Sequence, residues 1–216
     1  LLIGTGNKSE FDELEAQVFG ATIIKAIQSL DKTDATVIVD FTLGKSIISD
    51  DVACQVAYGV LLRSYSYNKY KTGAADNKEV RKEIKSLTFM VANPTSSRRR
   101  FRKFASVAAG VNFSRDLVSE PSNVKSPKWM SGQCRKLSKF GVKVEVLGES
   151  QMRKLRMNAL LGVGQGSVRE SQCVVMRWNG GKTGDKALAL VGKGVTFDTG
   201  GISIKPAGGM EDMIWD

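Results

Sequence analysis

The stretch LVGKGVTFDTGGISIKPAGGMEDMIWD, residues 190–216, joins the end of an apolar segment to a glycine-rich segment that carries scattered acids and lysines. Its first residues belong to the run ALALVG (187–192), which has the length and composition of a buried strand. In layered α/β proteins, ligands bind in the loops that follow the strands of a sheet. The stretch therefore predicts an α/β fold with a ligand site directly after a strand.

The residues before this stretch continue an alternation of helices and strands. Apolar periodicity predicts a helix over 127–140, the strand VKVEVL (142–147), a helix over 152–161 and the strand CVVMRW (173–178). The glycine-rich segment 179–185 has the composition of a hairpin loop. The strands on either side of it, 173–178 and 187–192, are therefore expected to pair.

The first 93 residues show the same alternation. Four elements are predicted there: a helix capped by Ser9 and ending near Leu30, the strand TVIVDF (36–41), a helix from Ile47 to Tyr65, and the strand LTFMV (87–91). This order of elements is typical of a layered α/β domain.

A domain boundary is predicted near residue 93. Asn93-Pro94-Thr95 breaks the preceding strand, and a helical pattern then runs to Phe113. Residues 1–93 hold 11 basic against 12 acidic side chains, whereas residues 94–216 hold 21 against 10. We therefore expect two α/β domains, residues 1–93 and 114–216, joined by a helix over 94–113.

Composition excludes several kinds of site. The chain has no histidine, which rules out Ser/His/Asp and Cys/His nucleophile systems within it as well as histidine-bound zinc. Its three cysteines are widely spaced, as expected of reduced thiols. No run of 18 apolar residues and no secretory signal is visible, so a cytoplasmic protein without a membrane partner is expected.

Four charged residues follow the last predicted strand: Lys193, Asp198, Lys205 and Asp216. Aspartate oxygens are hard donors that suit divalent cations. Lysine binds metal only as the neutral amine, which requires burial or a nearby dication because its ordinary pKa is about 10.4. Glycine-rich loops with scattered Asp and Lys are also ordinary turns, so the residue types alone leave both interpretations open.

The run VGKGVTFDTGGISIKP, with Met210, Met213 and Asp216 after it, resembles the signature region of the cytosolic leucyl aminopeptidases. FSRDLVSEPSN (113–123) resembles the start of that family's catalytic domain, and the two segments stand in the family's order. The resemblance implies that the second domain is a peptidase catalytic domain with a mixed sheet. It also implies removal of N-terminal residues, leucine preferred, from peptides with a free N-terminus.

The resemblance further implies a role for each site residue. Lys193, Asp198 and Asp216 correspond to metal ligands, with Asp198 bridging two divalent ions, zinc or manganese by expectation. Lys205 corresponds to the catalytic lysine that stabilises the charge on the scissile carbonyl oxygen, and Met213 to a residue of the pocket for the first side chain. The family's usual assembly is a homo-hexamer.

The family pattern also contains residues that are not found here. In the family, a second cluster completes the two metal sites and holds a bicarbonate that acts as general base, and it lies after the position of Asp216. The catalytic domain is therefore expected to be incomplete, and residues 1–216 alone are expected to have little or no peptidase activity.

Two other functions compete with this one. The basic run of the second part, Arg98, Arg99, Arg100, Arg102 and Lys103, would suit a nucleic-acid partner. A solvated helix face is the more usual explanation of such a run. A non-catalytic assembly module is the third interpretation, although such a module has no physical reason to keep the charges of the signature together.

Overall fold

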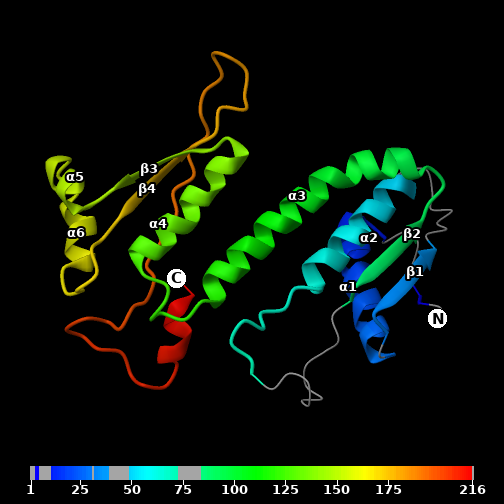
Figure 1. Ribbon diagram of the computed structural model, residues 1–216, viewed down its shortest axis with the longest axis horizontal. Coiled ribbons are helices and arrows are strands. Elements are labelled where there is room, and N and C mark those ends of the chain that lie inside the picture. The colour runs from blue at the N-terminus through cyan, green and yellow to red at the C-terminus, as the bar shows by residue number, and fades with distance from the viewer. Residues whose placement is uncertain (1–2, 5–10, 31, 39–48, 73–83, 216) are drawn as a thin grey trace. The chain divides into compact units, whose positions relative to one another are not determined.

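The computed structural model describes residues 3–4, 11–30, 32–38, 49–72 and 84–215. The chain forms two compact units, Leu1–Arg115 and Asp116–Asp216. Each unit combines helices with a small sheet (Figure 1), so the predicted α/β class is confirmed for both. Within the described ranges, no helix is both long and apolar enough to cross a membrane.

The first unit contains the predicted alternation. Its elements are α1 (Glu13–Ser29), β1 (Asp34–Ile38), α2 (Ser49–Arg63), β2 (Ser86–Met90) and most of α3 (Pro94–Ser119). Strands β1 and β2 pair in parallel, from Asp34 opposite Ser86 to Ile38 opposite Met90. Parallel pairing requires a crossover between the strands, and α2 lies in that connection.

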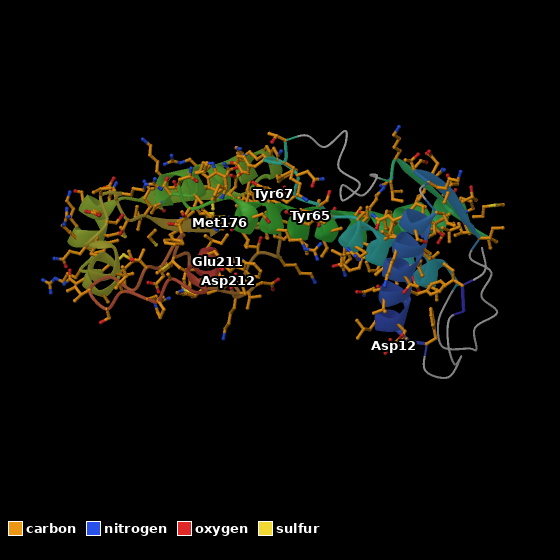
Figure 2. All side chains as sticks on the ribbon, turned by 90° about the horizontal axis from the view of Figure 1, so that it is seen from below. Asp12, Tyr65, Tyr67, Met176, Glu211 and Asp212 are labelled. Carbon is orange, nitrogen blue, oxygen red and sulfur yellow. The ribbon has the colours of Figure 1, made fainter. Side chains whose placement is uncertain are left out.

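Helix α1 is capped by Asp12, which Figure 2 labels at its start. The Asp12 side chain accepts a hydrogen bond from the Glu15 backbone N–H at 2.9 Å. The predicted cap, Ser9, lies outside the described residues, as do residues 39–48 at the ends of the predicted strand 36–41 and helix 47–65. Asp12 satisfies one of the backbone donors that a helix leaves unpaired at its first turn.

The core of the first unit lies between α1, α2 and the sheet. Its buried side chains are Phe11, Ala16, Ile23, Ile27, Val52 and Val56. The two helices approach each other closely at two glycines. A Cβ on Gly20 would lie 2.1 Å from the Val56 carbonyl oxygen, and a Cβ on Gly59 would lie 1.9 Å from the Gln17 carbonyl oxygen. Only glycine permits this contact between helix backbones.

Helix α3 begins at Pro94, as predicted, where the Asn93 side chain accepts a hydrogen bond from the Ser96 N–H at 3.0 Å. It continues past residue 113 to Ser119, because no breaker precedes Pro121. The predicted domain limits place a helix of residues 94–113 between the domains. In the structure the boundary between the two compact units falls within α3, between Arg115 and Asp116.

The second unit is built around an antiparallel pair of strands. Its elements are α4 (Pro127–Arg135), the 3₁₀ helix η1 (Lys136–Phe140), β3 (Lys143–Leu147), α5 (Glu149–Lys154), α6 (Asn158–Gly164), β4 (Cys173–Arg177) and the 3₁₀ helix η2 (Met210–Ile214). The strands pair from Lys143 opposite Arg177 to Leu147 opposite Cys173. Figure 1 shows β3 and β4 side by side.

The prediction of one helix over 152–161 is wrong, because two separate helices, α5 and α6, occupy this region. Arg156 lies between them in the left-handed region, with φ of 57°. A single left-handed residue ends an α-helix, and apolar periodicity carries no signal for it.

The strand predicted over 187–192 is also wrong, as is its hairpin with 173–178. Strand β4 pairs with β3, and residues 187–192 form no strand. Leu188, Leu190 and Val191 are 86%, 88% and 98% exposed. An apolar run indicates a strand only where a partner edge and a covering surface exist, and the described residues provide neither for this run.

Candidate functional site

The loop after residues 187–192 folds back on itself around Asp198. The Asp198 Oδ1 accepts a hydrogen bond from the Gly200 N–H at 2.8 Å. The Lys205 N–H then donates to the Thr199 carbonyl oxygen at 2.8 Å and closes the loop. Gly200 has φ of 91°, and a Cβ there would lie 2.2 Å from the Ser203 carbonyl oxygen. The loop therefore requires glycine at this position.

The Lys205 side chain points into this loop. Its ammonium donates to Asp198 Oδ2 at 3.1 Å and to the Met213 sulfur at 2.8 Å. The two side chains of the ion pair are 35% and 42% exposed. Three residues named by the signature, Asp198, Lys205 and Met213, are thus in one contact group although 15 positions separate the first from the last.

The surroundings of Asp198 keep its carboxylate ionised. The Gly200 N–H hydrogen bond lowers the pKa of Asp198 most, and the hydrogen bond from Lys205 lowers it next. The charges of Lys205 and Lys193 lower it further, and partial desolvation opposes them. The loop therefore presents an anionic oxygen donor near neutral pH.

The two remaining predicted ligands are Lys193 and Asp216. Lys193 is exposed, and the structure relates it to Asp198 through its charge. Asp216 lies outside the described residues. Among the residues that the structure does describe, no three His, Cys, Asp or Glu side chains gather around one point. The carboxylate of Asp198, with the side chain of Lys193 close enough for its charge to act on it, fits part of a divalent-cation site.

Comparison with protein families then identifies both parts of the chain. Residues 112–216 match the catalytic domain of the cytosol aminopeptidase family, and residues 1–74 match its N-terminal domain. The chain belongs to the cytosol aminopeptidase family. Asp198, Lys205 and Met213 all lie within the match to the catalytic domain.

Relatives within the cytosol aminopeptidase family match the whole chain. A probable cytosol aminopeptidase of Rhizobium johnstonii is 43% identical over all 216 residues, which cover 43% of that protein, and one of Chelativorans sp. is 45% identical over 42% of its length. The chain thus spans less than half the length of these curated relatives.

Solved structures agree with the fold. The bottromycin maturation enzyme BotP in complex with Mn superposes with a TM-score of 0.75 at 25% identity, covering 93% of this chain and 41% of that one. A tomato leucine aminopeptidase variant gives a TM-score of 0.70 at 24% identity, covering 80% and 34%.

Sequence reasoning missed one residue of this cytosol aminopeptidase catalytic domain, Lys125. It is 3% exposed, and its ammonium donates to the backbone carbonyl oxygens of Val118 and Ile214. A lysine between Pro121 and Pro127 is usually solvated, and no periodicity indicates otherwise. Its position two residues after the segment 113–123 is the only sequence signal that singles it out.

Proposed function

We propose that the complete protein containing this chain is an aminopeptidase that uses two divalent metal ions. It would remove N-terminal residues, leucine preferred, from peptides. The observation that carries the proposal is the Lys205–Asp198 ion pair, held in a closed loop within the match to the family's catalytic domain. The candidate carboxylate ligand and the candidate cationic charge stabiliser therefore lie together in one loop, where both could act on one substrate carbonyl.

Lys193, Asp198 and Asp216 would hold the metal ions, with Asp198 as the bridging ligand. The bound ions would supply polarisation of the scissile carbonyl and an activated water as nucleophile. The lowered pKa of Asp198 supports this role, because a metal ligand must be deprotonated. Manganese is supported by the manganese complex of BotP, and zinc remains the other expected metal. A bicarbonate acting as general base belongs to the same proposal for the complete protein.

Lys205 would donate a hydrogen bond to the scissile carbonyl oxygen as negative charge develops there. Its hydrogen bond to Asp198 fixes the direction of the ammonium. Met213 would contact the first side chain of the substrate. Its flexible thioether suits an unbranched or γ-branched apolar side chain such as leucine.

The assembly and the compartment are also proposals. A homo-hexamer is the expected assembly of the complete protein, and a cytoplasmic location is supported by the name of the family. Membership in the family supports both proposals.

The test is hydrolysis of L-leucine p-nitroanilide by the purified complete protein. We expect activity that a chelator abolishes and that manganese or zinc restores, and no cleavage of the N-acetylated substrate. Lys205→Ala should lower kcat by about 10²–10³. Lys182→Ala, which changes an exposed lysine outside the loop, should leave kcat unchanged. Activity that survives both chelation and Lys205→Ala would overturn the proposal.

A second candidate function is nucleic-acid binding through the start of α3. Arg98, Arg99, Arg100, Arg102 and Lys103 are all exposed. Arg98, Arg99 and Arg102 line a polar hollow of about 540 Å³ together with Asn93, Thr95 and Ser96, while Arg100 pairs with Asp51. Exposed arginines around a polar hollow suit phosphate contacts.

A further inference from the structure

Lys125 makes a buried link between two distant parts of the second unit. Its ammonium donates to the Ile214 carbonyl oxygen at 2.6 Å and to the Val118 carbonyl oxygen at 3.0 Å. Val118 lies in the last turn of α3, and Ile214 is the last residue of η2, 89 positions after Lys125. The link therefore joins the two segments of the sequence that carry the family resemblance.

Burial makes this arrangement costly unless the ammonium is hydrogen-bonded. Desolvation lowers the pKa of Lys125, and the charge of Glu120, which is itself only 5% exposed, raises it. A buried ammonium without acceptors would be strongly unfavourable, so the two carbonyl oxygens hold the side chain in a defined position. Because the ammonium is fixed between them, it also fixes the end of η2 against the end of α3.

Helix η2 leads from this link to the candidate site. Met213 is the residue before Ile214, and its sulfur accepts a hydrogen bond from the Lys205 ammonium at 2.8 Å. Lys205 in turn pairs with Asp198 at 3.1 Å. Displacement of η2 would move Met213 and remove one of the two contacts that orient Lys205.

We propose that Lys125 is a positioning residue for the peptidase reaction, acting through η2 on Met213 and Lys205. This inference rests on the proposed function for its kinetic part, whereas the link itself can be tested without activity. A lysine with a structural role only would change the stability of the protein and leave the kinetics of the folded enzyme as they are.

The experiment compares Lys125→Met with Lys128→Met in the complete protein. Lys128 is exposed on α4, so its substitution removes the same side-chain charge without the link. The first readout is amide hydrogen exchange of residues 209–215 in the metal-free protein. Lys125→Met should accelerate exchange there, while Lys128→Met should not.

The second readout is kinetic. Lys125→Met should lower kcat about tenfold or more with a smaller change in KM, since small displacements of catalytic groups cost up to about 10² in rate. Lys125→Arg, which keeps charged donors, should restore part of kcat. If Lys125→Met does not fold, Lys125→Gln is measured by the same two readouts.

Each outcome bears on the proposal. Accelerated exchange in 209–215 together with a lowered kcat supports it. Unchanged exchange, or unchanged kcat and KM in a folded Lys125 variant, overturns it. If the wild-type protein has no aminopeptidase activity, the proposed function fails, and exchange alone decides whether Lys125 holds η2.

Discussion

The ammonium of Lys205 lies 3.1 Å from Oδ2 of Asp198. The residue proposed to stabilise charge on the substrate therefore contacts the carboxylate proposed to bridge the metal ions. After the Gly200 N–H, which has the largest effect, this contact lowers the pKa of Asp198, because a cation beside a carboxylate favours its charged form. The Gly200 N–H binds the second carboxylate oxygen, so both Asp198 oxygens accept a hydrogen bond within the loop.

The first prediction concerns the pKa of Asp198. The Gly200 N–H and then Lys205 lower it in the folded protein, so this residue stabilises the fold above its ordinary pKa. That contribution is lost as the pH falls through the lowered value. Lys205→Met should raise the pKa of Asp198 toward its ordinary range. A ¹³C NMR titration of the metal-free protein measures it, and an unchanged value in the variant would contradict the ion pair.

The second prediction concerns Gly200. Alanine is unfavourable at the positive φ of this residue, and its Cβ would lie 2.2 Å from the Ser203 carbonyl oxygen. The loop must therefore rearrange to accept it. Strain of this kind costs on the order of 1–3 kcal/mol, and Gly200→Ala should weaken manganese binding and lower kcat by tenfold or more. Gly194→Ala is the control, since its Cβ would meet nothing within 4 Å. Calorimetric titration with manganese and steady-state kinetics compare the two variants.

The third prediction concerns the 216-residue chain by itself. The chain spans less than half the length of its curated relatives, and Asp198 is the one predicted carboxylate ligand among the described residues, so we expect the chain alone to be a poor peptidase. We expect its hydrolysis of leucine p-nitroanilide to be at least about 10³-fold slower than that of the complete protein, because losing even one group that stabilises the transition state costs about 10²–10³ in rate. Parallel assays at equal molar concentration measure this ratio. Comparable rates would show that the chain holds the complete site.

Much of the fold follows from apolar periodicity. The strands around Val37, Leu87, Val146 and Val175 were predicted because each alternates or is apolar over a strand's length, and each pairs with another described strand. The run 187–192 has the same composition and remains exposed. Periodicity reports which residues favour burial, but burial also needs a partner surface, and no local pattern encodes that.

In the candidate site, too, some residues can be predicted from the sequence and one cannot. Asp198 and Lys205 follow an apolar run in a glycine-rich stretch, the family resemblance implies their roles, and the structure brings them into contact. Lys125 was not singled out, because its role depends on Ile214, 89 positions away. Residue type gives no indication of this burial, since an isolated lysine between prolines is ordinarily exposed. Long-range contacts made by backbone acceptors leave no trace in the sequence of the donor.

The fourth prediction concerns the basic start of α3. If this surface binds nucleic acid, the triple variant Arg98→Ala, Arg99→Ala and Arg102→Ala should weaken binding and reduce the slope of log affinity against log salt by about 3. The triple variant Lys154→Ala, Lys182→Ala and Lys186→Ala removes the same charge from exposed positions elsewhere and is the control. Filter binding at several salt concentrations measures both. Equal effects of the two variants would indicate a response to net charge alone.

The fifth prediction concerns the contact between α1 and α2. A Cβ at residue 59 would lie 1.9 Å from the Gln17 carbonyl oxygen and 2.8 Å from the Gln17 Cα, so the obstacle is backbone and cannot rotate away. Gly59→Ala must push the helices apart and loosen the packing of Val52 and Val56 beneath them. Overpacking typically costs about 1–3 kcal/mol, and a backbone clash places this variant at or above the upper end.

Gly110→Ala is the matched control, because Gly110 lies in α3 of the same unit and its Cβ would meet nothing within 4 Å. The same substitution in an open helical position should stabilise the helix by about 0.5–1 kcal/mol, since alanine loses less backbone entropy than glycine. Urea denaturation, with hydrogen exchange of α1 and α2 to assign the transition, separates the two effects. Opposite signs are expected for the two variants, and a stabilising Gly59→Ala would show that α1 and α2 do not cross at this distance.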